Sequence, residues 1–108
     1  MTTIIYIRTS TEEQNPENQF KDCASLCDSE YEVVEEKKSA WKDDYKREGF
    51  NEILKSIKQR ECNELIVWDL DRIYRNRMKL IAFFKEAKYY DCKIRSYRQK
   101  FLEDITTA

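Results

Sequence analysis

The chain has 108 residues, a formal net charge of -1 and no histidine, which limits it to one domain with a single core and excludes a Ser-His-Asp triad. With 38% charged and 13% aromatic residues, it has the composition of a globular domain rather than of a disordered segment. It contains no apolar run long enough to span a bilayer and no secretory signal at its N-terminus, so we expect a cytoplasmic protein without a membrane partner.

The first part of the chain predicts a strand, a helix and a second strand. Residues 3–8 are apolar and β-branched with little alternation, as in a strand buried on both faces of a parallel sheet. Asn15-Pro16 predicts the start of a helix that runs to about Ser29. Residues 31–36 predict a shorter strand near the sheet edge. The expected inner face of the helix comprises Phe20, Cys23, Ala24 and Cys27.

The rest of the chain continues the alternation. A long polar connection over 37–47 contains Trp41, which either anchors the loop or stacks on a base. A helix ends near Arg60, and strands are predicted over 64–69 and 93–97. Apolar residues at helical spacing define the inner faces of two helices: Phe50, Ile53, Leu54 and Ile57 in the first, and Leu80, Ile81, Phe83, Phe84 and Ala87 in the second, which Asn76 caps. We therefore predict an α/β fold with three layers, α/β/α, around a mainly parallel sheet of four to five strands.

Polar residues suited to phosphate follow two of the predicted strands. Arg8 and Ser10 come at the end of the first strand, and Asp71, Arg72 and Arg75 follow the third. The carboxyl ends of parallel strands face one crevice, so these side chains can meet there. Arginine forks match the oxygens of a phosphodiester and keep their charge at any working pH, which favours attack by a serine on a phosphate.

Simpler interpretations exist for the same residues. Serine after a strand commonly caps the next helix, and Asp-Arg neighbours are commonly exposed ion pairs. Asp71 therefore either orients guanidinium groups and handles a proton, or forms a structural ion pair. Cys23 and Cys27 are interpreted as core residues. The four cysteines form no paired C-x-x-C arrangement, so we expect reduced thiols and no metal site.

Two stretches of the chain resemble motifs of the serine recombinases, the resolvase and invertase family. Tyr6-Ile7-Arg8-Thr9-Ser10 is similar to the family's Y-x-R-x-S signature, and residues 70–76, Leu-Asp-Arg-Ile-Tyr-Arg-Asn, resemble its L-D-R-x-x-R-[DN] motif. Arg47-Glu48-Gly49-Phe50 resembles its R-P-G-F segment, with glutamate in place of proline. Residues 101–107 are similar to the segment that precedes the family's long helix. The resemblance covers nearly the whole chain.

The resemblance implies a resolvase-like sheet of order 2-1-3-4-5, in which the last strand is short and antiparallel. It implies that residues 1–108 are a catalytic core, without the family's long dimerisation helix and DNA-binding region, as either a fragment or a naturally short protein. It leaves open whether the parent is a resolvase, an invertase, an integrase or a transposase. The alternative is a catalytically silent recombinase-like module that associates with DNA or dimerises as a regulator.

The resemblance also assigns roles within the site. Ser10 would attack the scissile phosphate and form a 5′-phosphoserine link to DNA. Arginines 8, 47, 72 and 75 would hold the phosphate oxygens, and no cofactor is implied. Gln14 and Gln19 would position the loop or the substrate, although Gln19 also fits a helix surface. The expected partners are double-stranded DNA at paired recombination sites and further copies of the chain, from dimer to tetramer, with the isolated core monomeric.

Charge is unevenly distributed along the chain. Residues 1–36 contain nine acids against two bases, whereas residues 69–100 contain ten bases against four acids. The second region can track a phosphate backbone, or it can be the solvated side of a helix and strand. Arg77 and Lys79 are the candidate DNA-binding residues, within a wider basic set that comprises Arg72, Arg75, Arg95 and Arg98.

Overall fold

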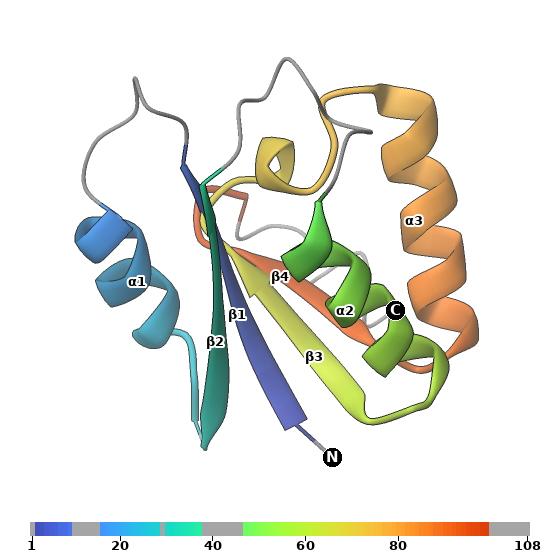
Figure 1. Ribbon diagram of the computed structural model, residues 1–108, viewed down its shortest axis with the longest axis horizontal. Coiled ribbons are helices and arrows are strands. Elements are labelled where there is room, and N and C mark those ends of the chain that lie inside the picture. The colour runs from blue at the N-terminus through green and yellow to red at the C-terminus, as the bar shows by residue number, and fades with distance from the viewer. Residues whose placement is uncertain (1, 10–15, 29, 38–46, 100–108) are drawn as a thin grey trace.

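The computed structural model describes residues 2–9, 16–28, 30–37 and 47–99, and Figure 1 shows a central sheet between helices. Four strands run parallel in the order β2-β1-β3-β4. Their bounds are Thr2–Thr9 for β1, Tyr31–Lys37 for β2, Cys62–Val67 for β3 and Lys93–Ser96 for β4. The predicted α/β class, the parallel sheet and the strand order 2-1-3-4 are confirmed.

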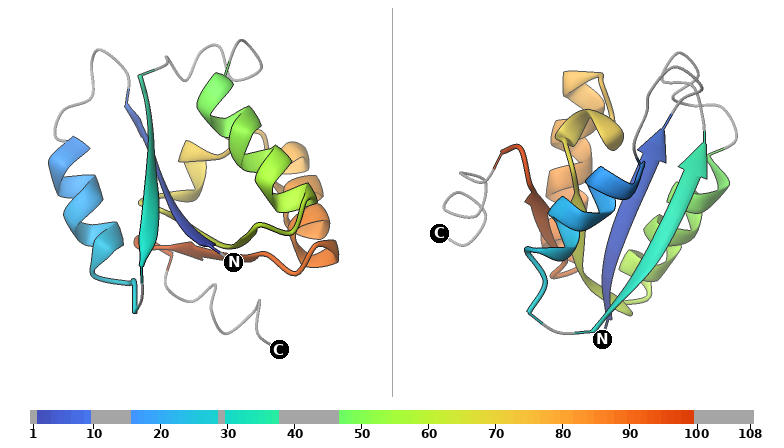
Figure 2. Two further views of the ribbon diagram at one scale, coloured as in Figure 1. Left: turned by 60° about the horizontal axis from the view of Figure 1, so that its bottom comes forward. Right: turned by 90° about the vertical axis from the view of Figure 1, so that its left-hand side faces the viewer.

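Helices cover both faces of the sheet (Figures 1 and 2). α1 (Pro16–Ala24) lies on one face, whereas α2 (Glu48–Lys58) and α3 (Arg77–Tyr89) lie on the other. A 3-10 turn, η2 (Leu70–Arg72), lies between β3 and α3. Asn76 caps α3 as predicted, since its side chain accepts a hydrogen bond from the backbone N–H of Lys79 at 3.1 Å.

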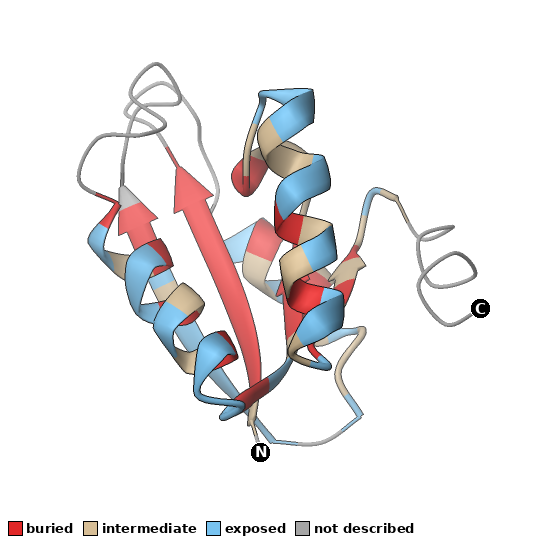
Figure 3. Ribbon diagram, turned by 90° about the vertical axis from the view of Figure 1, so that its right-hand side faces the viewer, coloured by how far each residue is buried: buried red, intermediate tan, exposed pale blue. Residues whose placement is uncertain are grey.

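Strand β1 divides the core into two parts because its successive side chains point to opposite faces. Ile5 and Ile7 pack toward α1 with Cys23. Ile4 and Tyr6 pack toward α2 and α3, where Phe50, Ile53, Ile57, Leu65, Val67, Phe83 and Ile94 complete the larger cluster. Figure 3 shows the inner strands and the inward sides of the helices as buried. The prediction of a first strand buried on both faces is therefore confirmed.

Gly49 brings the start of α2 close to β2. A Cβ at this position would lie 3.0 Å from Cγ1 of Val34 and 3.3 Å from Oε2 of Glu36. The backbone N–H of Gly49 instead donates to that carboxylate at 2.7 Å. The carboxylate of Glu36 thus satisfies an N–H in the first turn of α2, where backbone groups have no partner within the helix.

Three predicted details are wrong. Helix α1 ends at Ala24 rather than near Ser29, because the next residues form a tighter turn: Ser25 Oγ donates to the Asp22 carbonyl, and Leu26 N donates to the Cys23 carbonyl. Strand β3 ends at Val67, two residues early. Ile81 is 43% exposed and does not belong to the inner face of α3, which buries Phe83 and Ala87.

Some predictions fall outside the described residues, among them the loop tryptophan Trp41 and the fifth strand predicted near the end of the chain. The predicted helix ending near Arg60 is confirmed, since α2 ends at Lys58. No described helix has the length and hydrophobicity needed to cross a membrane.

Candidate active site

The end of β3 and the turn η2 form the centre of the candidate site. Asp69 is extended, with φ -147° and ψ 145°, and its carboxylate accepts a hydrogen bond from the N–H of Asp71 at 3.0 Å. This capping contact turns the chain sharply after the strand. The turn therefore presents Asp71 and Arg72 at the carboxyl edge of the sheet, where ligands of open α/β sheets commonly bind.

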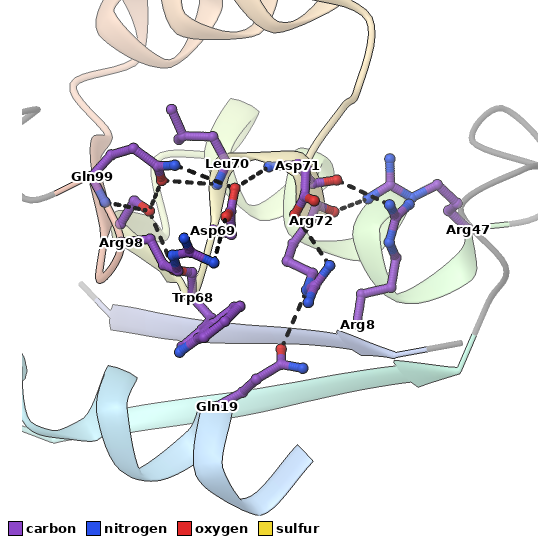
Figure 4. A network of polar contacts seen from close by, with 11 residues as sticks. Arg8, Gln19, Arg47, Trp68, Asp69, Leu70, Asp71, Arg72, Arg98 and Gln99 are labelled. Atoms are coloured by element: carbon purple, nitrogen blue, oxygen red, sulfur yellow. Dashed lines mark hydrogen bonds and ion pairs between the residues drawn. The ribbon is translucent and has the colours of Figure 1, made fainter. Parts of the chain in front are cut away.

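Arg8 reaches the turn from the neighbouring strand β1. Its side chain is 2% exposed, and Nη2 donates to the carbonyl of Asp71 at 3.0 Å (Figure 4). β1 pairs in parallel with β3, with Tyr6 opposite Val67, so both strands end at this edge of the sheet. The two motifs were predicted to lie close together, and the contact between Arg8 and Asp71 shows that they do.

Arg72 is buried and directed across the sheet edge toward α1. It is 7% exposed, and Nη1 forms an ion pair with Oδ1 of Asp71 at 3.1 Å. Its Nε lies 3.4 Å from Oε1 of Gln19, which is 5% exposed. Gln19 is therefore a buried neighbour of the arginine, and the interpretation of it as a plain surface residue is wrong.

Arg47 holds the far end of the same turn. It is 4% exposed, Nη2 donates to the carbonyl of Arg72 at 2.8 Å, and Nη1 donates to the carbonyl of Ile73. Its guanidinium carbon lies 4.2 Å from the ring centroid of Phe50 and 5.4 Å from that of Tyr74. Its Nε has no hydrogen-bond partner among the described residues. The charge is thus enclosed by aromatic rings and backbone carbonyls.

Tyr6 and Glu36 extend this buried network and were not predicted as site residues. Tyr6 Oη donates to Glu36 and accepts from Nη2 of Arg47 at 3.1 Å. Burial first, and then the hydrogen bond to Glu36, raise the pKa of Tyr6 well above its usual value, so the hydroxyl stays protonated. Glu36 lies opposite Arg8 in the parallel register and is 7% exposed. Its place two residues after Val34, on one face of β2, is the signal that indicates its burial.

Trp68 is a further neighbour that the motifs did not predict. Its ring centroid lies 5.5 Å from the guanidinium carbon of Arg72 and 5.1 Å from that of Arg98. Its Nε1 donates to Oδ2 of Asp22, in the last turn of α1, at 2.9 Å. Trp68 therefore connects the turn after β3 to the layer of α1, and it stacks against one of the candidate catalytic arginines.

The structure describes further predicted residues around α3 and β4, whereas two others lie outside the described residues. Arg75 and Arg77 are exposed near the start of α3, and Lys79 is half-buried in its first turn. Arg95 is directed inward rather than onto a basic surface, since Nη1 donates to the Leu26 carbonyl and contacts Glu64 at 3.4 Å. Ser10 and Gln14 lie outside the described residues. No group of ligands suited to a metal occurs within the described ranges.

The fold is that of a resolvase-like serine recombinase catalytic domain. The family model described as "Resolvase, N terminal domain" matches residues 3–108. The chain belongs to this family, and the resemblance noted from its motifs is confirmed. A search of curated protein sequences finds no match.

Three solved structures illustrate which proteins this chain is similar to. The first open reading frame in transposon ISC1904 from Sulfolobus solfataricus P2 matches with a TM-score of 0.78 at 23% identity, over 99% of this chain and 79% of that one. The C-terminal catalytic domain of ISC1926 TnpA, an IS607-like serine recombinase, matches with a TM-score of 0.75 at 18% identity. This match covers 97% of this chain and 78% of that one. The N-terminal catalytic domain of TP901-1 integrase matches with a TM-score of 0.74 at 15% identity. This match covers 99% of this chain and 89% of that one. The TM-scores show a shared fold, and at these low identities they show the fold alone.

Proposed function

We propose that this chain is the catalytic domain of a site-specific DNA recombinase that uses Ser10 as its nucleophile. The observation that supports this function best is the convergence of two buried arginines, Arg8 and Arg72, on Asp71 at the carboxyl edge of the sheet. Arg8 precedes Ser10 by two residues at the end of β1. A serine that follows a fixed arginine so closely in the sequence suits attack on a phosphodiester.

In the proposed reaction, Ser10 Oγ bonds to phosphorus while the bond from phosphorus to the 3′ oxygen breaks. The proton leaves the serine, the 3′ oxygen takes up a proton, and the products are a 5′-phosphoserine link and a 3′ hydroxyl. Rejoining reverses these steps after strand exchange, so no external energy source is consumed.

The arginines supply positive charge where charge develops on the transferring phosphate. Arg8, Arg72 and the exposed Arg75 are proposed to bind its nonbridging oxygens, and each charge-assisted contact contributes about 1.5 to 3 kcal/mol. Arg47 donates to the backbone carbonyls of Arg72 and Ile73. Its described contacts therefore hold the backbone that carries the Arg72 side chain. Asp71 orients Arg72 through their ion pair, and Gln19 limits the rotation of the same guanidinium group.

The proposed substrate is double-stranded DNA at paired sites, brought together by two to four copies of the protein. Arg77 and Lys79 lie in the first turn of α3, next to the motif that carries Arg75. We propose that these basic side chains contact the DNA backbone beside the scissile phosphate. Such contacts would fix the position of the protein on the DNA and make its affinity depend on salt, but they would not select a DNA sequence.

A covalent trapping experiment tests the function. The protein is mixed with DNA bearing the ends of its own genetic element, 5′ or 3′ labelled, and resolved on a denaturing gel. We expect wild-type protein to attach to 5′ ends and Ser10→Ala to form no adduct while binding the DNA with unchanged affinity.

Two results would contradict the proposal. An adduct that persists in Ser10→Ala would identify another nucleophile. Binding by both proteins without any adduct, under conditions that trap cleavage, would favour a catalytically silent regulator. Thr9→Ala is the matched control, because it removes a hydroxyl next to Ser10 in the chain and is expected to retain the adduct.

A further inference from the structure

The chain that follows β4 runs beside the chain that follows β3. Tyr97 N donates to the Val67 carbonyl and Arg98 N donates to the Trp68 carbonyl, both at 3.0 Å. These bonds continue the pairing of β3 with β4 beyond the end of both strands. As a result, Gln99 lies next to the turn that carries Asp71 and Arg72 (Figure 4).

The side-chain amide of Gln99 binds the first residues of that turn. Its Oε1 accepts the N–H of Leu70 at 3.2 Å, and its Nε2 lies 3.4 Å from Oδ1 of Asp69. The same Oδ1 accepts the N–H of Asp71 at 3.0 Å. Leu70 begins η2, where the N–H groups have no partner within the helix. Gln99 therefore fixes one amide of the turn directly and a second one through Asp69.

Gln99 is itself held in place. Ser96 Oγ, at the end of β4, donates to its Oε1, and the N–H of Gln99 lies 3.4 Å from that hydroxyl. Ser96 is 2% exposed, so this contact is shielded from water. An amide whose oxygen and nitrogen are both engaged has one preferred orientation.

The turn is thus held from two directions. Gln99 and Asp69 bind its amide N–H groups at the start, and Arg47 binds the carbonyls of Arg72 and Ile73 at the end. Neither Gln99 nor Asp69 belongs to the motifs that carry the proposed chemistry. We propose that Gln99 is a positioning residue, which orients the Leu70–Arg72 turn so that Asp71 and Arg72 face the reacting phosphate. The inference rests on the proposed function.

The test compares Gln99→Met with Gln59→Met in this protein. Methionine has nearly the length and volume of glutamine but lacks its amide, so packing is retained while the hydrogen bonds are lost. Gln59 is exposed at the end of α2 and contributes only its backbone to the cap. It is therefore a matched control for the same chemical change.

Three quantities are measured: the single-turnover rate constant for the covalent adduct, the affinity for DNA, and the hydrogen-exchange rates of individual amides. We expect Gln99→Met to lower the rate constant about 10- to 100-fold, since small misplacements of catalytic groups cost about that much. The affinity should stay within about twofold. The Leu70 amide should exchange at least about 10-fold faster, while amides of β1 and α1 keep their rates.

The outcomes separate the inference from the proposed function. If wild-type protein forms the adduct and Gln99→Met matches Gln59→Met in rate, the inference is wrong and the function stands. General acceleration of exchange in every element would show a loss of global stability and would also overturn it. If wild-type protein forms no adduct, the function fails and the proposal that Gln99 positions catalytic groups fails with it, while exchange at Leu70 still reports whether Gln99 holds the turn.

Discussion

Two arginines near the site differ in what surrounds them, and the difference predicts how each responds to substitution. Arg47 is 4% exposed, donates to two backbone carbonyls and lies against aromatic rings. Arg75 is exposed at the surface after η2. Lysine keeps the charge at either position but replaces the planar fork by a single ammonium group, which cannot bind both carbonyls in the same way.

We expect Arg47→Lys to lower the free energy of unfolding by about 2 to 3 kcal/mol, because hydrogen bonds from a charged group are lost in a buried site. Arg75→Lys should change it by less than about 0.5 kcal/mol and should slow adduct formation about 10- to 100-fold. Urea denaturation and the adduct assay measure the two effects. Equal stability of the two variants would contradict the role assigned to Arg47.

At this scale the sequence predicts the residues of the motifs and misses those that support them. Arg8, Arg72 and Asp71 were predicted together because they lie at, or just after, the carboxyl ends of two predicted strands, and the structure brings them together. Glu36 and Gln99 were not predicted as site residues. The alternation in β2 indicates the burial of Glu36, but its position opposite Arg8 depends on strand register. The role of Gln99 depends on the course of the chain after β4, which no local pattern reveals.

At the scale of elements, the contact between α2 and β2 depends on Gly49. Replacing glycine by alanine within a helix normally stabilises it by about 0.5 to 1 kcal/mol. Here the added methyl group would meet Val34 Cγ1 at 3.0 Å and the Glu36 carboxylate that caps the helix. Packing and propensity therefore act in opposite directions at this position, and steric strain in a close-packed region is the larger effect.

We expect Gly49→Ala to destabilise the protein by about 1 to 2 kcal/mol, measured by urea denaturation. Asn51→Ala, at an exposed position in the same helix, is the control and should be neutral or slightly stabilising. Combining Gly49→Ala with Val34→Ala should cost less than the sum of the two single changes, because the smaller residue 34 makes room. Full additivity would contradict the proposed clash.

Element boundaries were predicted less well than element types. All four described strands and all three helices lie where the hydrophobic pattern predicted them. The early end of α1 results from the Ser25 hydroxyl bonding to the Asp22 carbonyl, a local competition with the helix that hydrophobic spacing does not reveal. The end of β3 was predicted late because Trp68 continues the apolar run, although it belongs to the turn.

For the whole molecule, buried groups that stay protonated make stability depend on alkaline pH. Burial is the main cause that raises the pKa of Cys23 from 9.0 to about 12. Burial also raises the pKa of Tyr6, and the hydrogen bond with Cys62 is the main cause that raises the pKa of Cys92. Above pH 9 the unfolded chain loses a proton from Cys23 that the folded protein retains.

We therefore expect the ionisation of Cys23 to have no effect on the free energy of unfolding below about pH 8. Between pH 9 and about 12 it should lower that free energy progressively. This thiol contributes a slope of at most about 1.4 kcal/mol per pH unit. Urea denaturation from pH 8 to 10.5 measures the slope. Cys23→Ala should make it shallower, whatever its effect at pH 8, and identical slopes for the variant and the wild type would contradict this account.

The strand order also has a consequence for synthesis on the ribosome. β1 is made before the other described strands, yet it lies between β2 and β3 in the sheet. β2 pairs with one of its sides soon afterwards, whereas β3 is completed only at Val67. At about 5 to 20 residues per second, the second side of β1 waits on the order of seconds for its partner. During that interval a nascent chain exposes the apolar strand edge at Ile4 to Ile7, which makes early chaperone contact valuable for this fold.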